Sequence, residues 1–134
     1  MKSSFRTAQP GKLNTPWDIA YRKPPLKRLS RLDNKIMELE RGVTYFIEKI
    51  EKLGGETLYS CEGHPGNFYI MFDLPYETTL KLANHCTFSV IEVCYNFKHH
   101  NVKNRWVLRL MPHADKVKDA LLRTLAIEWE KVKV

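Results

Sequence analysis

Residues 57–72, TLYSCEGHPGNFYIMF, have the pattern of two β-strands joined by a turn. Thr57–Cys61 and Phe68–Phe72 are rich in the β-branched and aromatic residues that strands favour. The link between them contains two glycines and a proline, which are typical of a chain reversal. This stretch therefore predicts an antiparallel β-hairpin.

Upstream of the hairpin, apolar residues recur every three or four positions along residues 32–53. They are Leu32, Ile36, Leu39, Val43, Phe46, Ile50 and Leu53. This spacing predicts one helix of about 22 residues, beginning after Ser30 and burying a single apolar stripe. Gly54 and Gly55 are expected to end the helix, because glycine adopts the left-handed conformation without steric cost.

Downstream of the hairpin, four further elements are predicted from the hydrophobic pattern. They are a short helix at Tyr76–His85, a strand at Phe88–Tyr95, a strand at Arg105–Leu110 and a final helix at Ala114–Lys131. The expected order is helix, strand, strand, helix, strand, strand, helix. It predicts a single α+β domain over residues 29–134, with a mainly antiparallel four-stranded sheet packed with helices.

The N-terminal residues 1–28 contain four prolines and no periodic apolar pattern, which predicts an extended basic arm. Residues 1–30 hold seven Lys or Arg and one acid, so they carry +6 of the net charge of +7. A cationic arm favours a polyanionic partner such as RNA, DNA or an acidic protein face, and a solubilising tail is the alternative. The arm residues predicted to bind are Arg22, Lys23, Lys27 and Arg28.

The predicted turn places a thiol, a carboxylate and an imidazole close together, at Cys61, Glu62 and His64. Cys61 and His64 have the spacing of two metal ligands, but the chain lacks a matching second pair. A catalytic Cys61–His64 pair would need a geometry that residues on one tight turn seldom reach. The structural alternative has Cys61 in the core and Gly63 and Gly66 shaping the turn. We expect no catalytic residue, metal or cofactor, and we predict Glu62 and His64 as a second binding surface.

The strand Arg105–Leu110 alternates in character, with Trp106 and Leu108 on one face and Arg105, Val107 and Arg109 on the other. Within this strand, aromatic and basic side chains therefore do not share a face, as a base-stacking surface would require.

Three cysteines, an odd number, and the lack of a secretory signal predict reduced thiols in the cytoplasm. No apolar run approaches the length of about 20 residues that a membrane helix needs, so no membrane contact is expected.

The segment Leu53–Phe72, above all its SCEGHP motif at residues 60–65, resembles small uncharacterised proteins of phages and mobile elements. That resemblance implies a non-enzymatic inhibitor that binds a host protein or ribonucleoprotein complex, such as an anti-CRISPR-type inhibitor.

Ser60, Cys61 and Gly63 also resemble the Ser-Ser-Cys-Ser-Gly-Arg motif of the wybutosine-synthesis tRNA methyltransferase family. Glu62 and His64 replace the Ser that follows the Cys in that motif and its Arg. This second resemblance implies the alternative function of RNA binding or tRNA modification, with Cys61 and His64 near the site.

Overall fold

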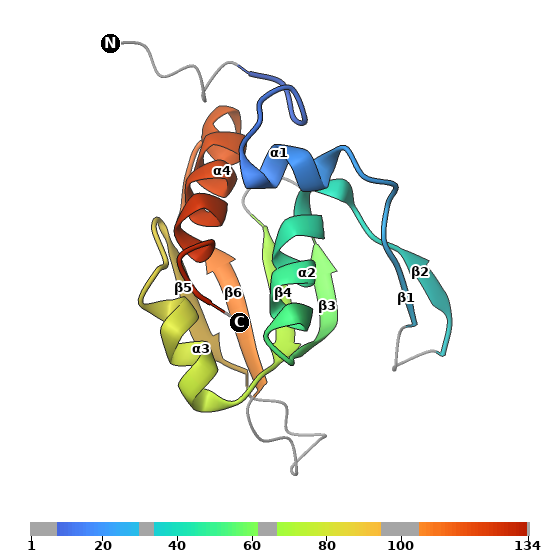
Figure 1. The fold of residues 1–134 in the computed structure, drawn as a ribbon, viewed down its shortest axis with the longest axis vertical. Coiled ribbons are helices and arrows are strands. Elements are labelled where there is room, and N and C mark those ends of the chain that lie inside the picture. The colour runs from blue at the N-terminus through green and yellow to red at the C-terminus, as the bar shows by residue number, and fades with distance from the viewer. Residues whose placement is uncertain (1–7, 30–33, 62–66, 95–104, 134) are drawn as a thin grey trace.

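The computed structural model of the chain describes residues 8–29, 34–61, 67–94 and 105–133. These residues form two antiparallel sheets, and the larger has the strand order β3-β4-β6-β5 (Figure 1). The strands are β1 (Lys27–Leu29), β2 (Ile36–Glu38), β3 (Glu56–Cys61), β4 (Tyr69–Asp73), β5 (Ser89–Val93) and β6 (Arg105–Leu110). The predicted α+β class and four-stranded antiparallel sheet are confirmed.

The α-helices of the described residues are α1 (Pro16–Tyr21), α2 (Thr44–Lys52), α3 (Tyr76–Ala83) and α4 (Lys118–Trp129). Short 3-10 helices, η2 (Arg41–Val43) and η3 (Asp115–Val117), lead into α2 and α4. From α2 to α4 the order of elements is the predicted one. The predicted β3–β4 hairpin is also confirmed, and its register contains a β-bulge between Thr57 and Tyr59.

The core lies between one face of the four-stranded sheet and the helices α2 and α4, which cross in front of it in Figure 1. Ile70 and Phe72 of β4 and Leu108 of β6 supply the sheet side and are fully buried. The ring of Phe46 in α2 packs edge-on against Trp129 in α4, with 5.4 Å between their centroids. These large side chains pair the two helices over the sheet.

The helix predicted to begin after Ser30 is wrong for the described residues 34–40. Residues 36–38 form β2, which pairs antiparallel with β1 in the register Leu29–Ile36 and Lys27–Glu38. Ile36 is 68% exposed, although the apolar stripe placed it on the buried side of a helix. Its C-terminal part, η2 and α2, is helical, and the pairing of β2 with β1 overrides the local helical pattern before it.

The end of α2 follows the prediction. Gly54 has a φ of +94°, its N–H donates to the carbonyl of Glu51, and the N–H of Gly55 donates to the carbonyl of Ile50. These two bonds form a Schellman motif, which satisfies the last carbonyls of a helix and turns the chain into β3.

The predicted separation of residues 1–28 as an extended arm is wrong for residues 8–28. Thr15 caps α1, Pro16 begins the helix, and Trp17 is only 1% exposed within the core cluster. The indole N–H of Trp17 donates to the carbonyl of Gly42, at 2.9 Å. Figure 1 shows α1 lying across one end of α2 and α4. Local proline content predicted an irregular chain, but burial of one large aromatic side chain anchors it.

A buried ion pair fixes α1 against α4. The guanidinium of Arg123 donates from Nε and Nη2 to the two carboxylate oxygens of Asp18, at 2.9 and 3.0 Å, and both side chains are fully buried. Arg123 also donates to the carbonyls of Ala8 and Gln9. Burial alone would raise the pKa of Asp18, but hydrogen bonds from Arg123, Thr15 and Gly11 hold that pKa below its usual value.

We predict that Asp18→Asn lowers the free energy of unfolding by about 3 kcal/mol or more, because it leaves the Arg123 charge buried without a counterion. Chemical denaturation measures this change. The matched control is Asp115→Asn, which alters an exposed carboxylate and should change stability by less than about 0.5 kcal/mol.

The same variant should change the pH dependence of stability. The folded chain lowers the pKa of Asp18, so this carboxylate stabilises the fold above its unfolded pKa of about 3.9. That contribution disappears as the pH falls towards the folded pKa. Below about pH 4, stability should therefore fall more steeply in the wild type than in Asp18→Asn; equal slopes would contradict the role of this pair.

A second prediction compares the loss of stability on replacing each of the two glycines after α2 with alanine. A Cβ on Gly55 would lie 2.7 Å from the carbonyl oxygen of Asp73, whereas a Cβ on Gly54 would meet nothing within 4 Å. Gly54→Ala should therefore cost only the strain of a left-handed backbone, about 1 kcal/mol. Gly55→Ala should cost about 2 kcal/mol or more. Thermal or chemical unfolding of the two variants measures the order, and a larger loss for Gly54→Ala would contradict it.

Candidate binding surfaces

The β1–β2 hairpin lies beside the four-stranded sheet, beyond α2 and β3 in Figure 1. Arg28 connects β1 to α2 by donating from Nε and Nη2 to the two carboxylate oxygens of Glu51, both at 2.9 Å. The N–H of Leu39 donates to the carbonyl of Leu26 at the base of the hairpin. Leu26 and Leu39 pack against the core, so the base is anchored while the strands extend outward.

The outward strands of this hairpin expose three large aliphatic side chains. Leu29, Ile36 and Met37 are 56%, 68% and 43% exposed. Leu29 and Ile36 are register partners, so they share one face, and Met37 lies on the other face opposite Arg28. We call these three residues the hairpin patch. Apolar side chains exposed on both faces of so short an element mark it as an element that another molecule can cover.

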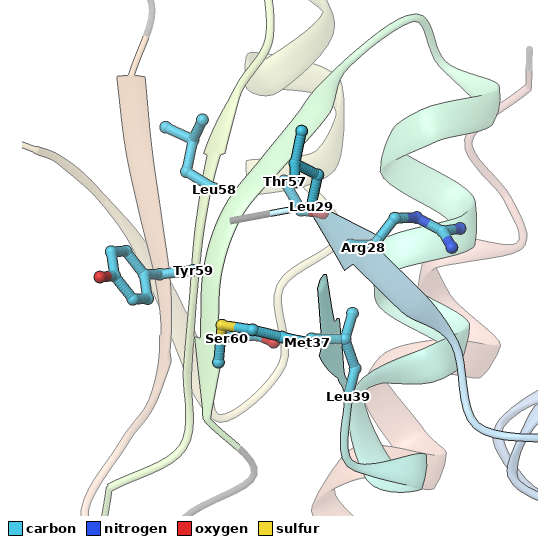
Figure 2. A pocket seen from close by; sticks show the side chains of 8 residues that line it. All are labelled: Arg28, Leu29, Met37, Leu39, Thr57, Leu58, Tyr59 and Ser60. Atoms are coloured by element: carbon cyan, nitrogen blue, oxygen red, sulfur yellow. The ribbon is translucent and has the colours of Figure 1, made fainter. Parts of the chain in front are cut away.

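A narrow groove separates the hairpin from β3 (Figure 2). It is lined by Arg28, Leu29, Met37, Leu39, Thr57, Leu58, Tyr59 and Ser60. Its free volume is about 30 Å³, whereas pockets for small ligands hold about 300–1,000 Å³. The groove is therefore too small for an enclosed metabolite, and a ligand there would have to lie over it.

Sequence reasoning missed the hairpin patch because it assigned Leu29 to the arm and Ile36 to a helix. One signal could have found it. The polar residues Asp33 and Asn34 lie between two short segments that contain apolar residues, a composition typical of a turn between strands. Asn34 has a φ of +57°, a conformation that asparagine tolerates better than most residues.

The predicted arm cations are for the most part bonded within the molecule. Arg22 donates to the carbonyls of Gly11 and Leu13, at 2.9 and 2.7 Å. Lys23 forms an ion pair with Glu48 at 3.0 Å, and Arg28 is held by Glu51. Lys27 is exposed at the start of β1. Lys23 and Arg28 thus attach residues 8–28 to α2, whereas Arg22 bonds within that segment.

The other predicted site residues, Glu62 and His64, lie outside the described residues. Cys61 ends β3 and is half-buried, and Cys61, Cys86 and Cys94 are all free thiols. Within the described ranges, no group of three or more His, Cys, Asp or Glu side chains is placed to hold a metal ion.

On the face of the four-stranded sheet opposite the core, an aromatic side chain of β4 lies beside a basic side chain of β6. Tyr69 of β4 is the register partner of Arg109, whose guanidinium lies 5.8 Å from the centre of the tyrosine ring. Nε of Arg109 also lies 3.5 Å from a carboxylate oxygen of Glu92. Nε of Arg105 lies 3.7 Å from a carboxylate oxygen of Asp73. Aromatic and basic groups therefore do share this face, but carboxylates offset both arginines.

A hollow of about 350 Å³ lies between α1, α2 and the end of α4. Its buried lysine, Lys49, donates to the carbonyl of Val132 at 2.6 Å, and burial lowers the pKa of this lysine. The hydroxyl of Tyr45 donates to Glu130 at 2.7 Å, and burial raises the pKa of the tyrosine. Both groups hold the C-terminal end of α4 against α2, so their role is structural.

Among the described residues, no helix combines the length and the apolar character needed to cross a membrane. Comparisons with family models, curated proteins and solved structures gave no match. The two resemblances of residues 53–72 therefore stay predictions.

A third prediction follows from the internal bonds of the arm cations. Arg22→Ala should lower the free energy of unfolding by about 1 kcal/mol, because two charge-assisted hydrogen bonds are lost at an exposed site. Lys27→Ala should change it by less than about 0.5 kcal/mol. Chemical denaturation of the two single variants measures the difference, and equal stabilities would show that residues 11–22 do not need this anchor.

Proposed function

We propose that this chain is a non-enzymatic binding protein that docks on a partner protein through the hairpin patch. The observation that carries the proposal is the exposure of Leu29, Ile36 and Met37 on a two-stranded element. This element is held at its base and through the Arg28–Glu51 ion pair. Two-stranded hairpins are marginally stable alone, and covering their apolar side chains stabilises them. A partner that buries the hairpin patch would therefore gain apolar contact and stabilise the hairpin at the same time.

The resemblance of residues 53–72 to phage and mobile-element proteins adds a class to this proposal. It implies an inhibitor that occupies a surface of a host protein or ribonucleoprotein complex. Such an inhibitor needs affinity and shape but no catalytic group. The described residues support that proposal by offering an apolar docking surface.

The RNA-binding alternative has one observation in its favour, the contact between Tyr69 and Arg109 on the open sheet face. Its weakness is charge, because Glu92 and Asp73 offset the two arginines there. Phosphate contacts supply most of the affinity of nucleic-acid binding, and a face with balanced charge offers few of them. We therefore favour protein docking by the hairpin patch over RNA binding by this sheet face.

A capture experiment tests the proposal with two double variants of a tagged chain in host-cell extract. The first variant, Leu29→Ser with Ile36→Ser, removes the outward side chains of the hairpin patch. It should lose captured partner by about tenfold or more, because each covered aliphatic side chain contributes roughly 1.5 kcal/mol or more. The partner is identified by mass spectrometry with and without nuclease, and should survive nuclease.

The matched control is Leu80→Ser with Ile127→Ser, which replaces aliphatic residues that are 45% and 36% exposed on α3 and α4. This control should keep the partner, and both double variants should unfold at the wild-type temperature. Loss of the partner in the control but not in the hairpin variant would overturn the proposal. Loss of all captured material with nuclease would favour the RNA-binding alternative.

A further inference from the structure

The strand β5 lies at one side of the four-stranded sheet and has a free edge. It pairs with β6 on one side, and no strand of the described residues pairs with its other side. The opposite edge of the sheet, at β3, differs because the hairpin stands beside it across the narrow groove (Figure 1). Main-chain groups on a free edge can bond to an added strand.

The hydrogen bonds between β5 and β6 show which main-chain groups face this edge. The N–H of Met111 donates to the carbonyl of Phe88. The N–H of Cys94 donates to the carbonyl of Arg105. Antiparallel strands bond at every second residue, so the even-numbered residues of β5 bond to β6 and the odd-numbered residues direct their N–H and C=O groups to the free edge. These outward-facing residues are Ser89, Ile91 and Val93.

The free edge of β5 lacks most of the features that keep edge strands apart. The strand contains no Lys, Arg or Pro, and its register with β6 has no bulge. Natural sheets use such residues and bulges to prevent pairing between edges. The one carboxylate of β5, on Glu92, lies 3.5 Å from Nε of Arg109 in β6. The edge is therefore open to a further strand.

Exposed apolar side chains lie at both ends of β5. Phe88, just before the strand, is 61% exposed, and Val93, its last residue, is 55% exposed. Phe88 also has a φ of +52°, a left-handed conformation that is sterically unfavourable for a residue with a bulky side chain. The fold thus holds an aromatic side chain in solvent by a strained backbone, and such strain is concentrated where residues contact other molecules.

From the free edge and its two apolar ends, we propose that β5 pairs with β5 of a second copy of this chain, antiparallel about a two-fold axis at Ile91. Antiparallel pairing brings the start of one strand to the end of the other. Val93 of each copy therefore comes beside Phe88 and Ser89 of the other copy. This match between the two ends of one strand favours a second copy as the occupant, because a two-fold interface must be complementary to itself.

The two-fold axis at Ile91 gives the longest ladder of hydrogen bonds. Ile91 then lies opposite itself and Ser89 lies opposite Val93, so all three outward-facing residues bond across the axis. An axis at Val90 would leave only Ser89 and Ile91 bonded within the strand. An axis at Glu92 would place two carboxylates directly opposite each other, which is unfavourable.

This inference does not rest on the proposed function. The hairpin patch lies beyond β3, at the side of the sheet opposite to β5 (Figure 1). A chain paired through β5 therefore still presents its hairpin patch to another protein.

Analytical ultracentrifugation of the full chain at increasing concentration tests the pairing. The weight-average mass should rise from that of one chain towards twice that value. Val93→Pro removes an outward N–H but no bond to β6, so it should weaken dimerisation by about tenfold or more, because the two-fold axis doubles the loss. Val93→Lys should also weaken dimerisation, since a lysine on an edge strand disfavours pairing.

The matched control is Ile36→Lys, which places the same cation on the exposed hairpin and should dimerise like the wild type. At concentrations where the chain is a single copy, all three variants should unfold at the wild-type temperature.

Amide hydrogen exchange locates the contact within the strand. At concentrations that give the mass of a dimer, exchange should slow by about tenfold or more at Ile91 and Val93, because their N–H groups become bonded. The amides of Val90 and Glu92 already bond to β6 and should change much less.

A mass of one chain at every concentration up to the solubility limit would overturn the proposal. A dimer that persists in both Val93→Pro and Val93→Lys, or one that is lost in Ile36→Lys, would place the contact elsewhere and also overturn it. These outcomes are separate from the capture experiment, which measures the loss of a different protein from a hairpin variant.

Discussion

The carboxylate of Asp18 and the guanidinium of Arg123 meet in the interior, although they lie 105 residues apart in the chain. Removing two charges from water is costly, and such a pair stabilises a fold only when hydrogen bonds satisfy it on all sides. Here Thr15 and Gly11 bond the carboxylate, and Arg123 also bonds two carbonyls of the N-terminal segment. The pair joins α1 to α4, and Trp17, bonded to Gly42, joins α1 to the entry of α2.

The position of the hairpin depends on that anchor. The chain passes from α1 directly into β1, so the placement of α1 determines where Lys23 and Arg28 can reach α2. Their ion pairs with Glu48 and Glu51 then hold the hairpin base beside β3. Because the anchoring contacts lie at the base, the strands keep Leu29 and Ile36 exposed to solvent. The hairpin thus presents an apolar surface away from the core, and this is the surface to which we assign the proposed docking role.

Several cations of the N-terminal segment are bonded within the protein, which the net charge of the chain does not show. The excess of cations in residues 1–30 predicted a free basic arm, and net charge is a sound argument about partners only where the charges face solvent. Lys23 and Arg28 instead bond to carboxylates of α2, and Arg22 bonds to carbonyls within its own segment. These cations belong to a segment that packs on the core, and their bonds help to hold the N-terminal part of the fold in place.

From Gly54 onward, the sequence by itself determined the elements, because local signals agree there. Two glycines end α2, segments rich in β-branched and aromatic residues form β3 to β6, and a periodic pattern forms α4, with boundaries close to those expected. Between residues 16 and 40, only the tertiary structure decided the outcome. The apolar stripe through Ile36 fits a helix as well as it fits an exposed strand, and nothing local pairs Asp18 with Arg123 or β1 with β2. Contacts between residues distant in the chain, or between strands across a turn, carry free energies larger than helix propensity, which is at most about 1 kcal/mol per residue outside proline. Asp33 and Asn34 indicate at most a turn there, whereas the exposure of the hairpin patch and its groove with β3 arise from those contacts and were not predictable from local pattern.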